Sequence, residues 1–228
     1  MNIATLSRIA PFSLYMAFIA LDGALLYLAG KGLLNFPDPY LLCLYPLKVL
    51  AVALVLFYFR HNYTEIRFRE LLSPIIIFFA SLIGAVVFIL WINLDQPFAT
   101  MGTLRGFDPN LFPAEGMRIF LIVSRLAGAA LVVPIMEELF WRSFLIRYIS
   151  APDFSKTPIG HFTWPSFLIT TVLFGLEHNL FLAGMLAGIA YNLLLYRTKS
   201  LAACIFAHGL TNLALGIYVL QTGKWYFW

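Results

Sequence analysis

Long apolar runs separated by short polar connections occupy most of the chain. They cover about residues 9–29, 41–59, 73–93, 118–133, 135–150, 164–179, 182–196 and 200–220. A helix needs ~20 residues to cross ~30 Å of hydrocarbon, so the shorter runs would lie in a thinned bilayer or stop short of one face. The pattern predicts an all-α, polytopic membrane protein: a bundle of about eight transmembrane helices.

The composition agrees with this class. Hydrophobic residues make up 61% of the chain, charged residues 11%, and the mean hydropathy is +0.86, whereas soluble proteins are roughly half apolar and a quarter charged. We find no linker-like stretch, so we expect one membrane domain over residues 1–228, multi-pass in the inner (plasma) membrane and in contact with lipids. The Lys and Arg residues are scattered and form no basic stripe, so nucleic acid is not expected as a partner.

The stretch "VVPIMEELFWRSFL", residues 132–145, places three charges in an apolar run. A carboxylate in mid-membrane costs at least ~2.5 kcal/mol and should have a partner. Arg142 follows Glu138 by one helical turn, so an ion pair between them is expected. Glu137 is rotated by ~100° and is free to face another group. Pro134 is expected to break the helix and leave Glu137 near the start of a new one. A purely structural salt-bridge cluster is the alternative.

Two further stretches carry polar residues. "LFGLEHNLF" contains His178, and "IFAHGLTNLAL" contains His208 and Asn212 one turn apart. Since successive spans are antiparallel, the start of 135–150 and the end of 164–179 lie on one side, and Glu137 and His178 can meet. A lone intramembrane histidine is more often a packed residue than a catalyst, but the combination favours a functional site.

These residues resemble the three motifs of a known family. The motifs are Glu137-Glu138-x-x-x-Arg142, Phe174-x-x-x-His178 and His208-x-x-x-Asn212, and in order and spacing they are similar to those of the CPBP intramembrane proteases, also called the Abi or CAAX prenyl protease family. The protease motif region covers about residues 118–220. "FGLEHNLFLAGMLAGIAYNLLLYRTKSL" and the "GKWYFW" end also resemble a bacterial CAAX protease-related subgroup associated with exosortase systems.

The resemblance implies an intramembrane endopeptidase that acts on a membrane-anchored peptide or on a prenylated or lipidated protein. Glu137 would be the general base, and His178 would hold the attacking water or relay its proton. His208 and Asn212 would donate hydrogen bonds to the tetrahedral oxyanion. A supporting pair would orient the base: Glu138 and Arg142.

Several alternatives stay open at this point. Two histidines and a glutamate can hold zinc, but H-E-x-x-H is missing and the resemblance implies a metal-independent glutamate mechanism, so we expect no metal and no cofactor. A proton-coupled transporter could use the same Glu and His side chains. A non-catalytic Abi-type immunity or scaffold protein is a third possibility. Glu177 either tunes His178 or faces a loop.

An even number of spans, eight, would also place both ends of the chain on the same side of the membrane. Both termini would share one face with Glu137 and His178, and the basic residues would divide seven against five between the two faces. That difference does not decide a positive-inside orientation. By resemblance, we expect the active face to point toward the cytosol.

Overall fold

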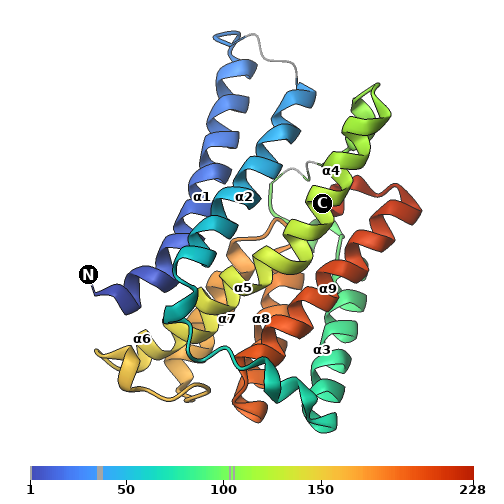
Figure 1. Cartoon of the computed structure of the whole chain (residues 1–228). Helices are drawn as coiled ribbons and strands as arrows, with labels where there is room; N and C mark the ends of the chain where they lie inside the picture. The colour runs from blue at the N-terminus through green and yellow to red at the C-terminus, as the bar shows by residue number, and fades with distance from the viewer. Residues whose placement is uncertain (1, 35–37, 103, 105) are drawn as a thin grey trace.

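The computed structural model describes residues 2–34, 38–102, 104 and 106–228, and within them the chain is a bundle of helices without strands (Figure 1). Short 3-10 turns lie in the connections. The helices are α1 (Ile3–Gly30), α2 (Leu44–Tyr58), α3 (Pro74–Asn93), α4 (Glu115–Ala127), α5 (Val133–Glu138), α6 (Ile146–Ser150), α7 (Trp164–Leu176), α8 (Phe181–Thr198) and α9 (Leu201–Thr222).

Five helical segments in the described part of the chain are long and apolar enough to cross a membrane. They are Ile3–Gly30, Tyr40–Tyr58, Pro74–Asn93, Glu115–Ser150 and Leu201–Thr222. Trp164–Leu176 is apolar but shorter. The all-α, polytopic class is therefore confirmed, and the protein is a multi-pass membrane protein.

The fourth and fifth predicted spans form one continuous helix, Glu115–Ser150, of 36 residues. It comprises α4, α5 and α6, joined by π-helical turns at Gly128–Val132 and Leu139–Leu145. The expected break at Pro134 does not occur, and Glu137 lies well inside this helix. The number of helices therefore differs from the eight predicted.

The helix continues through Pro134 because a neighbouring helix supplies the missing hydrogen bond. In the first π-helical turn, the Val133 N–H donates to the Gly128 carbonyl, five residues back. The next donor in this pattern would be Pro134, which has no N–H. The Asn212 side chain of α9 instead donates to the Ala129 carbonyl at 2.9 Å. This bond removes the cost of an unpaired carbonyl in an apolar environment.

α7 and α8 form a hairpin that begins and finishes at the same end of the bundle. Lys199, directly after α8, donates to the carbonyl of Gly160, shortly before α7. The turn between the helices, residues 177–180, lies against the connection after α3, where the Met101 N–H donates to the Asn179 carbonyl at 2.7 Å. The hairpin thereby places the histidine of the second motif beside the ends of α3 and α9.

A buried polar cluster ties the start of α1 to the long helix. Arg8 pairs with Glu65 of the α2–α3 connection at 2.7 Å, and Arg147 of α6 approaches the same carboxylate at 3.9 Å. The Ser143 hydroxyl also donates to Glu65. Arg147 donates to the Thr157 carbonyl at 3.2 Å. One carboxylate therefore compensates two buried guanidinium groups from different helices.

Glu65→Gln is expected to lower the stability of the folded protein strongly, because Arg8 and Arg147 lose their counter-charge. Breaking a buried ion pair costs ~3–5 kcal/mol, whereas an exposed pair such as Asp153 with Lys156 contributes little. Thermal unfolding in detergent should show a large fall in midpoint for Glu65→Gln and almost none for Asp153→Asn. Equal midpoints would contradict a structural role for the cluster.

The two termini lie beside different connections of the bundle. The contacts of Glu65 with Arg8 and Arg147 place the end of α6 beside the N-terminus. The Phe107 N–H donates to the Trp225 carbonyl, which places the C-terminal segment beside the α3–α4 connection. The expectation that both termini share a face is wrong, because joining the fourth and fifth spans reverses the direction of every later helix.

The reversal also redistributes the basic residues. Among the residues that the structure describes, the end of the bundle near the N-terminus carries eight: Arg8, Arg60, Arg67, Arg69, Arg147, Lys156, Arg197 and Lys199. The opposite end carries three: Lys31, Arg118 and Lys224. Arg105 lies outside the described residues.

Candidate active site

The two adjacent glutamates of α5 have different surroundings. Glu138 is fully buried and accepts a hydrogen bond from Arg142 at 3.1 Å, so the ion pair predicted from the spacing is present. Oε2 of each glutamate is buried and accepts no hydrogen bond from any described residue, but only the side chain of Glu137 lines a cavity. Buried polar atoms normally have a partner, so the position of Glu137 suits a ligand or a water molecule.

Arg142 is held by groups that the sequence did not reveal. Its guanidinium lies over the Phe174 ring at 4.4 Å and near the Tyr191 ring at 5.3 Å. Its Nε donates to the Asn192 side chain at 3.2 Å, and Asn192 in turn donates to Thr170 at 3.1 Å. These contacts fix the guanidinium, and through it the carboxylate that it pairs with.

His208 lies between the two glutamates. Its Nδ1 is 3.0 Å from Glu138 Oε1, and its Nε2 is 4.0 Å from Glu137 Oε2. A carboxylate only accepts hydrogen bonds, so Nδ1 of His208 carries a proton. The other ring nitrogen, Nε2, faces the cavity. The Tyr191 ring stacks on the imidazole with centroids 5.1 Å apart, and its hydroxyl donates to Thr211 at 2.9 Å. The ring of His208 is therefore held in one orientation.

His178 follows directly after α7 and approaches the site from the hairpin. Its Nδ1 lies 2.7 Å from the Phe174 carbonyl, and a carbonyl only accepts, so this nitrogen is the donor. The other ring nitrogen of the neutral tautomer is then an acceptor. The Trp91 ring packs edge-on against the imidazole, with centroids 5.2 Å apart. The Phe174 ring lies 5.1 Å away on the same measure, so one hydrogen bond and two aromatic contacts fix the position of the imidazole.

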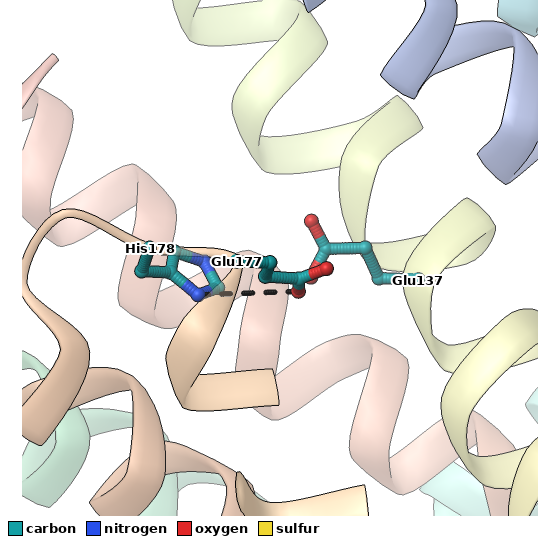
Figure 2. A group of neighbouring side chains, drawn as sticks. All are labelled: Glu137, Glu177 and His178. Atoms are coloured by element: carbon teal, nitrogen blue, oxygen red, sulfur yellow. Dashed lines mark ion pairs between the residues drawn. The ribbon is translucent and has the colours of Figure 1, made fainter. Parts of the chain in front are cut away.

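The predicted meeting of Glu137 and His178 is present, and Glu177 joins them. Ligand-type atoms of these three side chains lie within 4.8 Å of one another. Figure 2 shows the carboxyl groups of Glu137 and Glu177 facing each other, with the ring of His178 on the other side of Glu177. Sequence reasoning left the direction of Glu177 undecided between a contact with His178 and a loop.

A cavity of about 210 Å³ connects these groups. Its polar lining includes Glu137, Glu177, His178, His208 and Asn212, and most of its other walls are aromatic or aliphatic. It shares three lining residues with a second cavity of about 320 Å³: Tyr45, Arg125 and Trp228. The second cavity is lined partly by the α3–α4 connection, so the pair of cavities extends toward the end of the bundle that carries fewer basic residues.

Comparison with known proteins identifies the segment that builds this cavity. Residues 119–214 match the family model described as type II CAAX prenyl endopeptidase Rce1-like. Over these residues the chain is similar to CAAX-type prenyl endopeptidases. No curated protein and no solved structure matches it. The matched segment runs from α4 into α9 and contains all six side chains predicted for the site. The exosortase-associated subgroup remains a prediction.

Asn212 has a structural contact as well as a place in the cavity. One N–H of its amide donates to the Ala129 carbonyl. A side-chain amide has two N–H groups, so a second donor remains for the cavity that Asn212 lines. Asn212 therefore both provides the donor that Pro134 lacks in the long helix and lines the cavity.

A metal ion would find a different ligand set from the one considered on the sequence. The oxygen and nitrogen atoms that lie close enough together among the described residues belong to Glu137, Glu177 and His178, with His208 outside the cluster. Two carboxylates and one imidazole are a donor set that zinc accepts. The alternative therefore has to be tested by chelation.

The polar residues that sequence reasoning missed share one signal. Asn192 lies in the apolar α8 helix and Thr170 in α7, and both are buried. Polar side chains inside a span generally have a partner or a function. Applying that rule to uncharged residues would have selected Asn192. It would not have predicted that Asn192 contacts Arg142.

Proposed function

We propose that this protein is a CAAX-type intramembrane glutamate endopeptidase. It hydrolyses a peptide bond of a membrane-anchored or lipidated substrate with a water molecule that Glu137 activates. The observation that carries the proposal is the buried Glu137 carboxylate, which has an oxygen without a protein partner and faces His178 and His208 across the cavity.

Glu137 and His178 form the water-binding half of the site. The Glu137 carboxylate accepts a proton from the attacking water as the O–C bond forms. The acceptor nitrogen of neutral His178 can receive the second hydrogen of the same water, since the other ring nitrogen is occupied by the Phe174 carbonyl. Both hydrogens of the water then have acceptors, which orients an oxygen lone pair toward the scissile carbonyl.

His208 and Asn212 form the oxyanion-binding half. For Nε2 of His208 to donate, the ring must carry both protons, and Glu138 at Nδ1 compensates the resulting charge. Asn212 contributes its second N–H group. Two fixed donors aimed at the developing negative charge stabilise the tetrahedral intermediate in an environment that excludes bulk water.

Glu138 and Arg142 act as positioning residues. Glu138 binds Arg142 and His208 with the same oxygen, Oε1, so it fixes the histidine and offsets its charge at once. The rings of Phe174 and Tyr191 and the amide of Asn192 hold the guanidinium in turn. This arrangement suits a hydrolase in which the reacting groups must not move during the reaction. Similarity to the family model favours it over the transporter and scaffold alternatives.

Chelation distinguishes the glutamate mechanism from a zinc hydrolase. Purified protein in liposomes should cleave an internally quenched farnesylated peptide at the same rate before and after exhaustive treatment with a zinc chelator. Elemental analysis should find zinc well below one ion per chain. Loss of cleavage on chelation, restored by added zinc, would overturn the proposal.

The basic residues also favour an orientation. Cytoplasmic connections of membrane proteins carry an excess of Lys and Arg, so the end with eight basic residues is expected in the cytosol. The cavities extend toward the other end. The active site then opens away from the cytosol, the reverse of the placement that the family resemblance implied.

Cysteine labelling tests this orientation. In a Cys43→Ser background, Thr64→Cys exposes a thiol at the N-terminal end of the bundle and Ala114→Cys one at the opposite end. The remaining Cys204 is buried. A membrane-impermeant maleimide added to spheroplasts should label Ala114→Cys at once and Thr64→Cys only after lysis. The opposite labelling pattern would place the active cavity toward the cytosol.

A further inference from the structure

Glu177 is the one acidic side chain of the active cavity to which the glutamate mechanism assigns no role. It lies in the turn between α7 and α8, and only 11% of its side chain is exposed. Its Oε1 is buried and receives no hydrogen bond of ordinary geometry from any described residue; the neighbouring donor is the indole of Trp141, which is neutral and supplies no counter-charge. The nearest cationic candidate is His178, whose Nδ1 is 3.9 Å away and already donates to the Phe174 carbonyl.

The charges around Glu177 leave no partner for a second carboxylate. Two buried carboxyl groups at the separation of Glu137 and Glu177, within 4.8 Å, do not both ionise, and such a pair holds one proton. Arg142 is bound to Glu138, and His208 lies between Glu138 and Glu137. The charged groups of these elements therefore balance when Glu137 is ionised and Glu177 is neutral.

Arg125 is the other cation that lines the cavity, and no ion pair joins it to Glu177 among the described residues. It lies on α4, twelve residues before Glu137, which corresponds to ~18 Å along a helix. Its guanidinium lies over the rings of Tyr45 and Phe107, at 4.3 and 5.2 Å. Glu177 is therefore a carboxylic acid with its proton inside the cavity, close to the general base.

The geometry points to Glu177 as the general acid of the reaction, the group that protonates the leaving amine. This inference rests on the proposed endopeptidase function and completes it, because Glu177 holds its proton before the reaction begins, whereas Glu137 gains one only from the attacking water. An amine leaves a tetrahedral intermediate only when its nitrogen is protonated.

The proton movements balance without any further reactant. The water oxygen bonds to the scissile carbon while one water proton moves to Glu137. The C–N bond then breaks, and its electron pair takes the proton of Glu177, which releases the amine product. The proton on Glu137 finally passes to the Glu177 carboxylate across the short gap between them. One water molecule is consumed, and both carboxyl groups return to their starting states.

A pair of substrates that differ only in the leaving group tests this role. The first is an internally quenched peptide whose scissile bond follows an S-farnesylcysteine, and it releases an amine. The second is the p-nitrophenyl ester of N-acetyl-S-farnesylcysteine, which releases p-nitrophenolate, an anion that needs no proton. Glu177→Gln should lower kcat/KM for the peptide by ~10²- to 10⁴-fold and leave the ester within a factor of about three of the wild type.

The folded state provides a second readout. Glutamine has nearly the shape of a protonated glutamate and is also neutral, so Glu177→Gln should unfold at the wild-type temperature in detergent. Glu177→Asp keeps the acid but withdraws it by one methylene group, and it should slow peptide cleavage more than ester cleavage. Glu115→Gln, an exposed change at the start of α4, is the matched control and should leave both rates unchanged.

The outcomes separate this role from the proposed function. Equal losses on peptide and ester, or full peptide cleavage by Glu177→Gln, would overturn the general-acid role while wild-type cleavage still supports the endopeptidase. Loss of bound zinc in Glu177→Gln together with both activities would make Glu177 a metal ligand instead. If Glu177→Gln does not fold, an equal effect of Glu177→Asp on both substrates would overturn the role.

Discussion

Glu137→Gln is expected to lower kcat/KM for a quenched farnesylated peptide by ~10²- to 10⁴-fold without lowering the folded yield in detergent. Glutamine keeps the shape of the side chain but cannot accept the water proton. Because Oε2 of Glu137 receives no hydrogen bond from a described residue and lies 4.0 Å from Nε2 of His208, the change breaks no hydrogen bond that supports the fold. The loss should therefore be one of catalysis alone.

The experiment measures initial rates of peptide cleavage and the thermal unfolding midpoint for the same preparations. Glu115→Gln repeats the chemical change on the same long helix at an exposed position, and it should retain both properties. A well-folded Glu137→Gln protein that cleaves at the wild-type rate would exclude Glu137 as the base and remove the main support for the proposed function.

Glu138→Gln is expected to reduce both activity and stability, although it lies one residue away. Glu138 is fully buried and receives hydrogen bonds from Arg142 and His208. Removing its charge leaves the Arg142 guanidinium, which is 1% exposed, without a counter-ion, and breaking a buried pair costs ~3–5 kcal/mol. The unfolding midpoint and the folded yield should fall together with peptide cleavage.

The double variant Glu138→Gln/Arg142→Met provides the control for this effect. Replacing both members of a buried pair is often close to neutral for stability, so the midpoint should recover part of the loss. Activity should stay low, because His208 still lacks the carboxylate that orients it. Wild-type stability of Glu138→Gln alone would show that the pair does not support the fold.

Local spacing predicted the chemistry of the first motif. The side chains of Glu138 and Arg142 are four residues apart on one helix, and such neighbours meet whatever surrounds the helix. The contact between Glu137 and His178 was also predictable, since two helices joined by a short connection run antiparallel. The apolar runs were sufficient to determine the all-α membrane class, because their length and composition fit helices that cross a bilayer.

Interactions between distant segments were not predictable in the same way. In the sequence, Pro134 predicts a helix break because proline has no backbone N–H. The packing of α9 brings Asn212 to the Ala129 carbonyl, which the proline leaves without an N–H donor. Because the helix is continuous from Glu115 to Ser150, all later helices run in the opposite direction from the one predicted, and the positions of the termini and of the basic residues change with them.

The sequence by itself determined the membrane class, the three motifs and the pairs of groups that are close along a helix or across one connection. Tertiary structure decided which of the polar groups face the cavity: it bound Glu138 to His208, and it brought Glu177 to Glu137 through the α7–α8 hairpin. The physical reason is that hydrogen bonds and charges inside an apolar bundle are paired across helices, and those partners are fixed only when the helices pack.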